Sequence, residues 1–336
     1  PDDRVTPAVA KADGVDYLVL PGWKIFMIQF LNIAGTGPIF GAILGAKFGP
    51  VAYLWIVLGC IFAGATHDYL SGMLSMRNDG ASLPELIGKY LGRNAKMVML
   101  AFTVLLLIMV GTVFVYSPAE ILHSIWGSSL FWIIVIFAYY VIATMLPIDK
   151  IIGKIYPLFA FSLLFMAGAL MVMLFVKMPQ LPELWTHFYN MGAEAEPDKW
   201  TDQIFPCLFI TIACGAISGF HATQSPLMAR CVKSEHIGRP IFYGAMITEG
   251  VVALIWATVS SWFFYGSPAP GYELIAAVNT GFSTSAPAVV NIVCNDWLGV
   301  AGGILALLGV VAAPITSGDT AFRSARLIIG EWLHID

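Results

Sequence analysis

The stretch NIAGTGPIFGAILGAKFG, residues 32–49, decides how the rest of this sequence is interpreted. It is predicted to form an interrupted membrane helix, because Gly35, Gly37 and Pro38 free backbone amides and carbonyls inside an apolar run. Such a break is tolerated at bilayer depth where protein, water or a ligand pairs with the freed groups. Glycines also recur at every fourth residue, at Gly37, Gly41, Gly45 and Gly49. Because this spacing forms a ridge that another helix can approach closely, the stretch is either a packing ridge or a ligand-facing break.

Composition identifies an integral membrane protein. Hydrophobic residues make up 58% of the 336 residues, charged residues make up 11%, and the mean hydropathy is +0.80. These values lie far from those of an average soluble domain. Apolar runs long enough to cross a hydrocarbon core of about 30 Å recur along the sequence, so residues 1–336 are expected to form one all-α, polytopic transmembrane domain in a lipid bilayer. No soluble domain, cofactor, catalytic residue or nucleic-acid partner is predicted.

Eight membrane spans are predicted from these runs. They cover approximately residues 23–46, 51–76, 97–116, 130–146, 156–176, 204–228, 241–265 and 297–330. The last span passes Pro314, and a loop is expected from Gly266 to Asp296. With the N-terminus in the cytoplasm, 14 of the 17 lysines and arginines fall on the cytoplasmic side, as the positive-inside rule requires. This asymmetry supports the layout and a cytoplasmic N-terminus.

The interrupted stretch has a counterpart later in the sequence. Residues 33–41 and 212–220 both contain Ile-Ala followed by a Gly-X-X-X-Gly core, and the two cores are 215 − 37 = 178 residues apart. Five spans separate them, so the second unit enters the membrane from the opposite side. Paired broken helices in inverted repeats are typical of secondary transporters, which hold their substrate near the midplane. We expect a first repeat over about 23–178, a partial second repeat over about 203–330, and two further helices outside this sequence.

Several short motifs occur in an order that resembles one known family. They are Asp2-Asp3-Arg4 with Thr6-Pro7-Ala8, residues 33–40, His67-Asp68 within residues 64–69, residues 219–222, and Thr316-Ser317-Gly318-Asp319-Thr320-Ala321. Over nearly its whole length the sequence is similar to the carbon starvation protein A family of bacterial inner-membrane proteins. The resemblance implies a LeuT-like transporter of the amino acid, polyamine and organocation superfamily, which imports peptides or pyruvate during carbon limitation. Family members usually carry helices before and after these motifs, in agreement with helices outside this sequence.

The two breaks supply the candidate substrate site. The residues predicted to line it are Asn32, Gly35, Thr36, Gly37, Ser218, His221 and Gln224. Half-helix ends present amide donors to an anion, which suits a small carboxylate such as pyruvate or the carboxyl end of a peptide. The residues do not choose between these substrates.

Ionisable residues inside spans are candidates for ion coupling, because they are costly to bury. His67 and Asp68 lie in the second span as either a polar pair that packs the helix or a proton-accepting pair, since imidazole titrates near physiological pH. Glu249 lies in the repeat-related seventh span. An isolated carboxylate there either bonds to a neighbouring helix or takes up a proton. The expected mechanism is symport with alternating access, coupled to protons or to sodium.

A sodium site is the second coupling hypothesis. In LeuT-like transporters, adjacent hydroxyls on the eighth helix help to coordinate sodium against carbonyls of the first broken helix, and Thr316 and Ser317 occupy similar positions. The alternative is that both hydroxyls bond back to carbonyls one turn earlier, as is common in helices. The coupling ion is therefore left open between a proton and sodium.

Two other functional classes compete with transport. An intramembrane enzyme or a membrane nutrient sensor could each use His67 and Asp68. A lone histidine and aspartate are a weak signal for an enzyme, because no nucleophile or metal cluster accompanies them in the sequence. No soluble output domain supports a sensor, so transport is the preferred interpretation.

Overall fold

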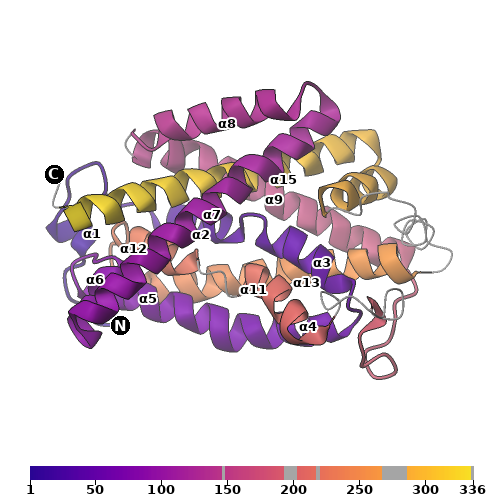
Figure 1. The fold of residues 1–336 in the computed structure, drawn as a ribbon, viewed down its shortest axis with the longest axis horizontal. Helices are drawn as coiled ribbons and strands as arrows, with labels where there is room; N and C mark the ends of the chain where they lie inside the picture. Colours follow the sequence, from indigo (N-terminus) through magenta and orange to yellow (C-terminus); the bar gives the residue numbers. More distant parts are fainter. Residues whose placement is uncertain (146–147, 193–202, 217–219, 267–285, 334–336) are drawn as a thin grey trace.

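The structure, a computed structural model, describes residues 1–336 except 146–147, 193–202, 217–219, 267–285 and 334–336. Within the described residues every regular element is a helix, which confirms the all-α prediction. The main helices run along the longest axis of the molecule, and both chain termini lie at the same end (Figure 1). This end is called the terminal end below, and the opposite end is called the distal end.

The elements of the described chain have the following bounds. They are α1 (Pro7–Ala10), α2 (Gly22–Ala34), η1 (Gly37–Gly41), α3 (Ala42–Ala46), α4 (Val51–Leu58), η2 (Gly59–Gly64), α5 (Ala65–Arg77), α6 (Leu83–Leu91), α7 (Arg93–Ile125), α8 (Ser129–Ala143), α9 (Ile148–Lys177), η4 (Ile204–Leu208), α11 (Phe209–Ala216), α12 (His221–Ala229), η5 (Glu235–Ile237), η6 (Arg239–Tyr243), α13 (Gly244–Tyr265) and α15 (Ala286–Leu333). The short elements η1, η2, η4 and η6 are π-helical turns, and η5 is a 3₁₀ turn.

The first span is broken where the sequence predicts. Helix α2 ends at Ala34, and α3 continues after the π turn η1 with a bend of 49° between the two halves. Gly35 adopts a left-handed φ of 47°, which favours glycine. A Cβ atom at this position would also lie 3.0 Å from the Phe114 ring and 3.3 Å from Ser317 Oγ. The break is therefore fixed both by backbone conformation and by close packing.

The first part of the predicted counterpart, residues 212–216, is helical. Residues up to Ala216 are helical in α11, so Cys214 and Gly215 belong to the helix and not to the break. Helix α12 begins at His221, and residues 217–219 lie outside the described residues. The glycine at 215 is tolerated inside a helix at a cost of about 1 kcal/mol, which is why a Gly-X-X-X-Gly pattern alone does not locate a break.

Several helices are long and apolar enough to cross a membrane. Judged by length and composition, four described segments qualify: Val51–Arg77, Arg93–His123, Tyr156–Lys177 and Glu235–Tyr265. The bent pair of α2 and α3 is a fifth if it counts as one span. These segments agree with the predicted membrane protein, whereas the total of eight spans stays a prediction.

The predicted loop from Gly266 to Asp296 is wrong in its last third. Residues 286–296 are helical, because α15 begins at Ala286 and kinks at Gly299, whose φ is 66°. The proline at position 287 suits the first turn of a helix, where a missing amide hydrogen costs nothing. The continuation of this helix past Pro314 is as predicted.

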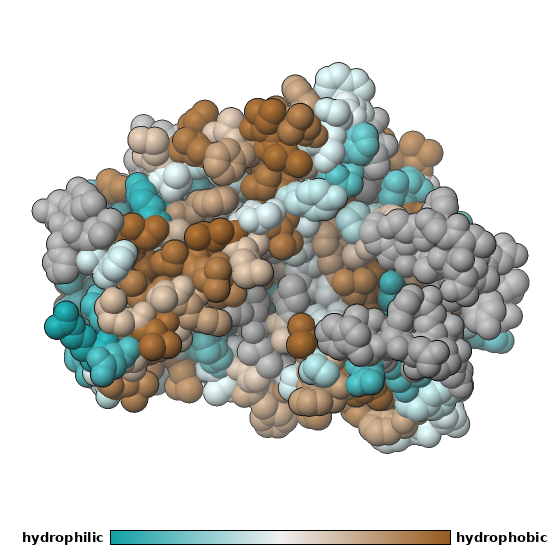
Figure 2. Space-filling model, in the orientation of Figure 1, coloured by the Kyte–Doolittle hydropathy of each residue, from teal (hydrophilic) through white to brown (hydrophobic). Residues whose placement is uncertain are grey.

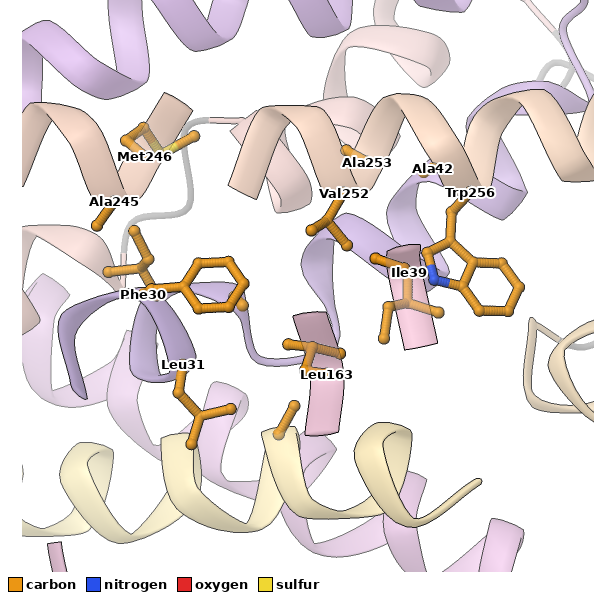
Figure 3. Close-up of a cluster of buried hydrophobic side chains, with 14 of the residues drawn as sticks. Phe30, Leu31, Ile39, Ala42, Leu163, Ala245, Met246, Val252, Ala253 and Trp256 are labelled. Carbon is orange, nitrogen blue, oxygen red and sulfur yellow. The ribbon is translucent and has the colours of Figure 1, made fainter. Parts of the chain in front are cut away.

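The core forms where α2 and its continuation pack on α13. Figure 3 shows Phe30 beside Ala245 and Met246, and Ile39 close to Trp256. Figure 2 shows hydrophobic side chains across the middle of one face and hydrophilic side chains gathered at the terminal end. An apolar middle beside a polar end suits a bundle whose long axis crosses the bilayer.

The second span and α13 contact each other closely at two glycines. A Cβ atom at Gly72 of α5 would lie 2.6 Å from the Phe242 ring, and one at Gly250 of α13 would lie 2.5 Å from Cys60 Sγ. Gly72 thus packs against η6, which contains Phe242, and Gly250 packs against η2, which contains Cys60. Small residues are needed there for the backbones to approach.

Gly250→Ala is expected to lower the free energy of unfolding in detergent by about 1–3 kcal/mol, because the added methyl group overlaps Cys60. The matched control is Gly168→Ala in α9, where a Cβ atom meets no atom within 4 Å. Thermal unfolding of both variants beside the parent protein checks this. Equal shifts in Tm would contradict the close packing.

Candidate functional site

A histidine held between two carboxylates lies at the centre of the bundle. His221 Nδ1 lies 3.2 Å from Asp68 Oδ2, and His221 Nε2 lies 3.6 Å from Glu249 Oε2. The imidazole is 1% exposed and both carboxylates are 0% exposed. His67 extends the group toward the surface, with its Nδ1 3.0 Å from Asp68 Oδ1. We refer to His67, Asp68, His221 and Glu249 as the acid–histidine cluster.

Four elements bring the acid–histidine cluster together at the first break. Asp68 lies in the first turn of α5, His221 begins α12, and Glu249 lies in α13. The fourth element is α2, because His221 Nε2 also lies 3.1 Å from the carbonyl oxygen of Ile33, next to the residue that ends this helix. Both α5 and α13 follow directly after π turns, which are frequent at functional sites.

The structure combines two sets of predicted residues that the sequence kept apart. His67, Asp68 and Glu249 are predicted for coupling, and His221 is predicted for substrate contact. In the structure His221 lies between the Asp68 and Glu249 carboxylates, in one cluster with the residues predicted for coupling. A sequence signal for this does not exist, since Asp68 comes more than 150 residues before His221 and the three helices meet through tertiary packing.

Two buried amide side chains lie beside the cluster. Asn32 and Gln224 are both 0% exposed, and neither has a side-chain hydrogen-bond partner within the part of the chain that the structure describes. One turn away, Gln29 Nε2 donates to Ser225 Oγ over 3.0 Å. Gln29 Oε1 is also without a partner among the described residues, so the α2–α12 contact contains paired and unpaired amide groups.

The remaining predicted substrate residues lie at the break itself or outside the described chain. Gly35 and Thr36 separate α2 from η1, and Gly37 begins η1. Thr36 is buried, with 6% exposure. Ser218 falls within residues 217–219 and lies outside the described residues.

The two hydroxyls predicted for sodium differ in their contacts. Ser317 Oγ donates to the carbonyl oxygens of Leu31 (3.3 Å) and Asn32 (2.9 Å), so it touches the broken helix. Thr316 Oγ1 donates to Ala313 O one turn earlier, over 2.9 Å. Ser317 thus lies against α2 as a sodium site requires, whereas Thr316 has the back-bonded arrangement.

A second buried polar group lies on α15 and includes Asp319 and Arg323. Tyr156 OH of α9 donates to Asp319 Oδ2 over 2.6 Å and lies 3.2 Å from the Thr316 carbonyl oxygen. Arg323 donates to the Ala143 carbonyl oxygen over 3.1 Å. These contacts hold α15 against α8 and α9, and a tyrosine inside an apolar span is the signal that could have suggested them.

Sequence reasoning missed an ionic group at the terminal end. The Arg77 guanidinium donates two hydrogen bonds to the Glu235 carboxylate, at 3.0 and 2.9 Å, and Arg4 Nε lies 3.4 Å away from the same carboxylate. The Glu235 side chain is 0% exposed. Nearby, Thr6 Oγ1 donates to the Val232 carbonyl oxygen over 2.6 Å. The N-terminal segment is therefore bound to the loop between α12 and α13.

Comparison with known proteins identifies relatives over most of the chain. A protein of Haemophilus influenzae described as an uncharacterized membrane protein is 47% identical over 321 residues, which cover 82% of this chain and 86% of the relative. The peptide transporter CstA of Escherichia coli is 28% identical, over 75% of this chain and 44% of its own length. The pyruvate/proton symporter BtsT of Escherichia coli is 27% identical, over 77% of this chain and 44% of its own length.

The chain thus spans less than half the length of these two transporters. A family profile described as carbon starvation protein CstA matches residues 1–131 and 115–291. The match includes the broken first span and all members of the acid–histidine cluster. The resemblance found in the short motifs is confirmed: the chain belongs to the carbon starvation protein CstA family.

Proposed function

We propose that this chain forms the transport core of a secondary active transporter, which imports small carboxylates or peptides across the bacterial inner membrane by alternating access. The observation that carries the proposal is the acid–histidine cluster, whose Asp68, His221 and Glu249 side chains are buried where α2 is broken. A buried ionisable group in a membrane helix bundle marks an ion or substrate path. The names of relatives as peptide and pyruvate transporters support the same class.

The reciprocal packing of the second span and α13 supports a LeuT-like inverted repeat. Gly72 and Gly250 are 250 − 72 = 178 residues apart, which is the offset of the two Gly-X-X-X-Gly cores. Each packs against the other span's π turn or its first residues. A pseudo-two-fold axis between two repeats produces such a pair of contacts, because the glycine of each repeat then meets the equivalent region of the other repeat.

Hydrogen-bond accounting supports proton coupling. The Ile33 carbonyl oxygen can only accept, so His221 Nε2 carries a hydrogen and donates it. His221 Nδ1 then faces the Asp68 carboxylate at 3.2 Å, and a second hydrogen is needed between these two atoms. A neutral ring and an ionised carboxylate would place two lone pairs against each other. A hydrogen on His221 Nδ1 or on Asp68 would remove this conflict, so the arrangement suits a group that gains and loses a proton.

The same cluster accounts for His67 and Asp68 without an enzyme or a sensor. Asp68 bonds to His67 on one oxygen and faces His221 with the other. His67 and Asp68 belong to a chain of titratable groups that reaches from the half-exposed His67 to the buried Glu249. Such a chain suits proton passage. Transport thus makes use of every member of the cluster.

Uptake into proteoliposomes tests the proposal. Vesicles that contain the full-length protein are expected to accumulate labelled pyruvate or a labelled peptide when an inward proton gradient is imposed. Protein-free vesicles and vesicles treated with a protonophore are the controls. If neither substrate accumulates under a proton or a sodium gradient, the transport proposal fails.

Ser317→Ala combined with Thr316→Val tests the sodium hypothesis. If sodium binds between α2 and α15, the variant is expected to lose the sodium dependence of uptake, because the hydroxyl that lies against the Leu31 and Asn32 carbonyls is removed. Initial uptake rates measured with sodium or with choline as the salt cation check this. Sodium-dependent uptake that persists in the variant would exclude these hydroxyls as ligands.

A further inference from the structure

Two basic side chains lie where α6 meets α7, and no carboxylate neutralises them. Lys89 lies in the last turn of α6, Arg93 begins α7, and both are exposed. Glu85 precedes Lys89 by four residues in the same helix, a spacing that favours an ion pair, yet it pairs with Lys96 of α7. Among the described residues, neither Lys89 nor Arg93 forms an ion pair. We refer to residues 89–93 as the α6–α7 corner.

Lys89 is held in place by neutral groups. Its Nζ donates to Oδ1 of Asn78, which ends α5, and lies 5.9 Å from the centre of the Tyr90 ring. Asn78 Nδ2 also lies 3.3 Å from the Tyr90 hydroxyl, so the three side chains form one group. Asp79, the next residue, pairs with Lys11. The charge of Lys89 is therefore positioned but not neutralised, which suits recognition of an anion.

The α6–α7 corner lies at the end of a membrane span. Arg93–His123 is one of the segments that are long and apolar enough to cross a membrane, and Gly92 alone separates it from α6. Gly92 has a φ of 90°, a conformation that favours glycine. Figure 1 shows α6 and the first turns of α7 at the terminal end. The two charges are therefore expected at the depth of the lipid headgroups.

An apolar stripe continues from the α6–α7 corner along α7. Val98, Phe102, Leu105 and Met109 follow one another at spacings of four, three and four residues, which places them on one helix face. Their exposed fractions lie between 57% and 72%. Leu91, within the corner itself, is 73% exposed. The corner thus offers charges for a headgroup, and the stripe beside it offers apolar surface for acyl chains.

An anionic glycerophospholipid combines the two chemistries. Its phosphodiester accepts hydrogen bonds from ammonium and guanidinium groups, and its chains match the apolar stripe. A tyrosine beside the lysine is typical of the membrane–water interface. A soluble phosphate would use the two charges alone and would leave the stripe without a role.

We propose that the α6–α7 corner binds the headgroup of an anionic phospholipid such as phosphatidylglycerol. Lys89 and Arg93 contact the phosphate, and the stripe on α7 contacts the acyl chains. Basic groups directly outside a membrane helix are suited to this recognition. The proposal concerns lipid binding, so it is tested without transport and stands or falls separately from the proposed function.

Thermal unfolding of the purified full-length protein in detergent tests the proposal. The probes are dioctanoyl phosphatidylglycerol, dioctanoyl phosphatidylcholine, which has the same chains and a zwitterionic headgroup, and inorganic phosphate. Phosphatidylglycerol is expected to raise Tm as its concentration rises, because it binds the folded protein. The concentration that gives half of the maximal shift is expected to be at least about tenfold lower than for phosphatidylcholine.

Two double variants locate the site. Lys89→Gln combined with Arg93→Gln is expected to bring the half-maximal concentrations of the two lipids to within about twofold of each other. Lys24→Gln combined with Arg239→Gln is the matched control, because it removes the same charge from the same end. Lys24 and Arg239 also lie over aromatic rings, each at 5.9 Å, so the control includes the loss of stacked charge. It is expected to keep the preference for phosphatidylglycerol.

Three results would overturn the proposal. Equal half-maximal concentrations of the two lipids in the parent protein would exclude recognition of an anionic headgroup. A shift of the same size with inorganic phosphate alone would assign the charges to a soluble anion. Equal losses of preference in the two double variants would show an effect of net charge and not of the α6–α7 corner. If a variant fails to fold, as judged by gel filtration, the lipid series on the parent protein decides.

Discussion

Glu249→Gln is expected to reduce proton-driven uptake by about tenfold or more, while exchange of labelled for unlabelled substrate across the membrane continues. The glutamine keeps the shape and hydrogen-bonding capacity of the side chain and removes its ability to gain and lose a proton. Because Glu249 Oε2 lies 3.6 Å from His221 Nε2, it is one of the two carboxylates with which the ring could exchange a proton in the proposed mechanism. The measurement is the initial rate of uptake under an imposed gradient, compared with counterflow without one.

Glu85→Gln is the matched control for this variant. Glu85 of α6 forms an ion pair with Lys96, is 39% exposed and is not a member of the cluster. Its replacement removes one carboxylate of the same type and should leave both assays unchanged. Unchanged gradient-driven uptake in Glu249→Gln would remove Glu249 from the coupling mechanism, even if transport itself is demonstrated.

Arg77→Leu is expected to destabilise the terminal end of the bundle more than any other charge removal there. The buried Glu235 carboxylate loses two hydrogen bonds and keeps only the more distant Arg4. Because Arg77 is 40% exposed and water can partly replace it, the cost is about 2 kcal/mol instead of the larger value for a fully buried pair. Arg77→Lys should have an intermediate effect, since lysine keeps the charge and loses the two-pronged contact.

Modification of Cys231 measures this effect locally. This cysteine is fully buried, and its carbonyl oxygen accepts a hydrogen bond from the Leu20 amide of the N-terminal segment. If the Arg77→Leu change lowers the free energy of local opening at this end by about 2 kcal/mol, the rate at which Cys231 reacts with N-ethylmaleimide should rise at least about tenfold. Peptide mapping identifies the modified site. A rate equal to that of the parent protein would show that Arg77 does not hold the segment closed.

The sequence predicts those features that depend on local chemistry. The break near Gly35 follows from glycine and proline in an apolar run, and it is found there. The start of the second break and the loop before α15 are predicted less well, because a single glycine at 215 does not stop a helix and Ala286 can begin one. Local patterns thus establish that spans exist, while tertiary packing decides where several of them end.

The candidate site was predicted residue by residue but not as an arrangement. Asp68, His221 and Glu249 each stand out as ionisable groups inside apolar runs, whereas their mutual distances depend on how α5, α12 and α13 are packed. Glu235 could not be singled out, because an acidic residue in a loop has no periodic pattern that distinguishes a buried side chain from an exposed one. The role of each member of the site remains a proposal that the variants above test.

The hydrogen bond from His221 to the Ile33 carbonyl ties the break in α2 to the acid–histidine cluster. The two ring nitrogens serve different partners, because Nε2 donates to Ile33 and Nδ1 faces Asp68. A rotation that takes the ring away from Asp68 therefore also takes it away from the end of α2, so in the proposed cycle a change in the charge of the cluster would act directly on the broken helix.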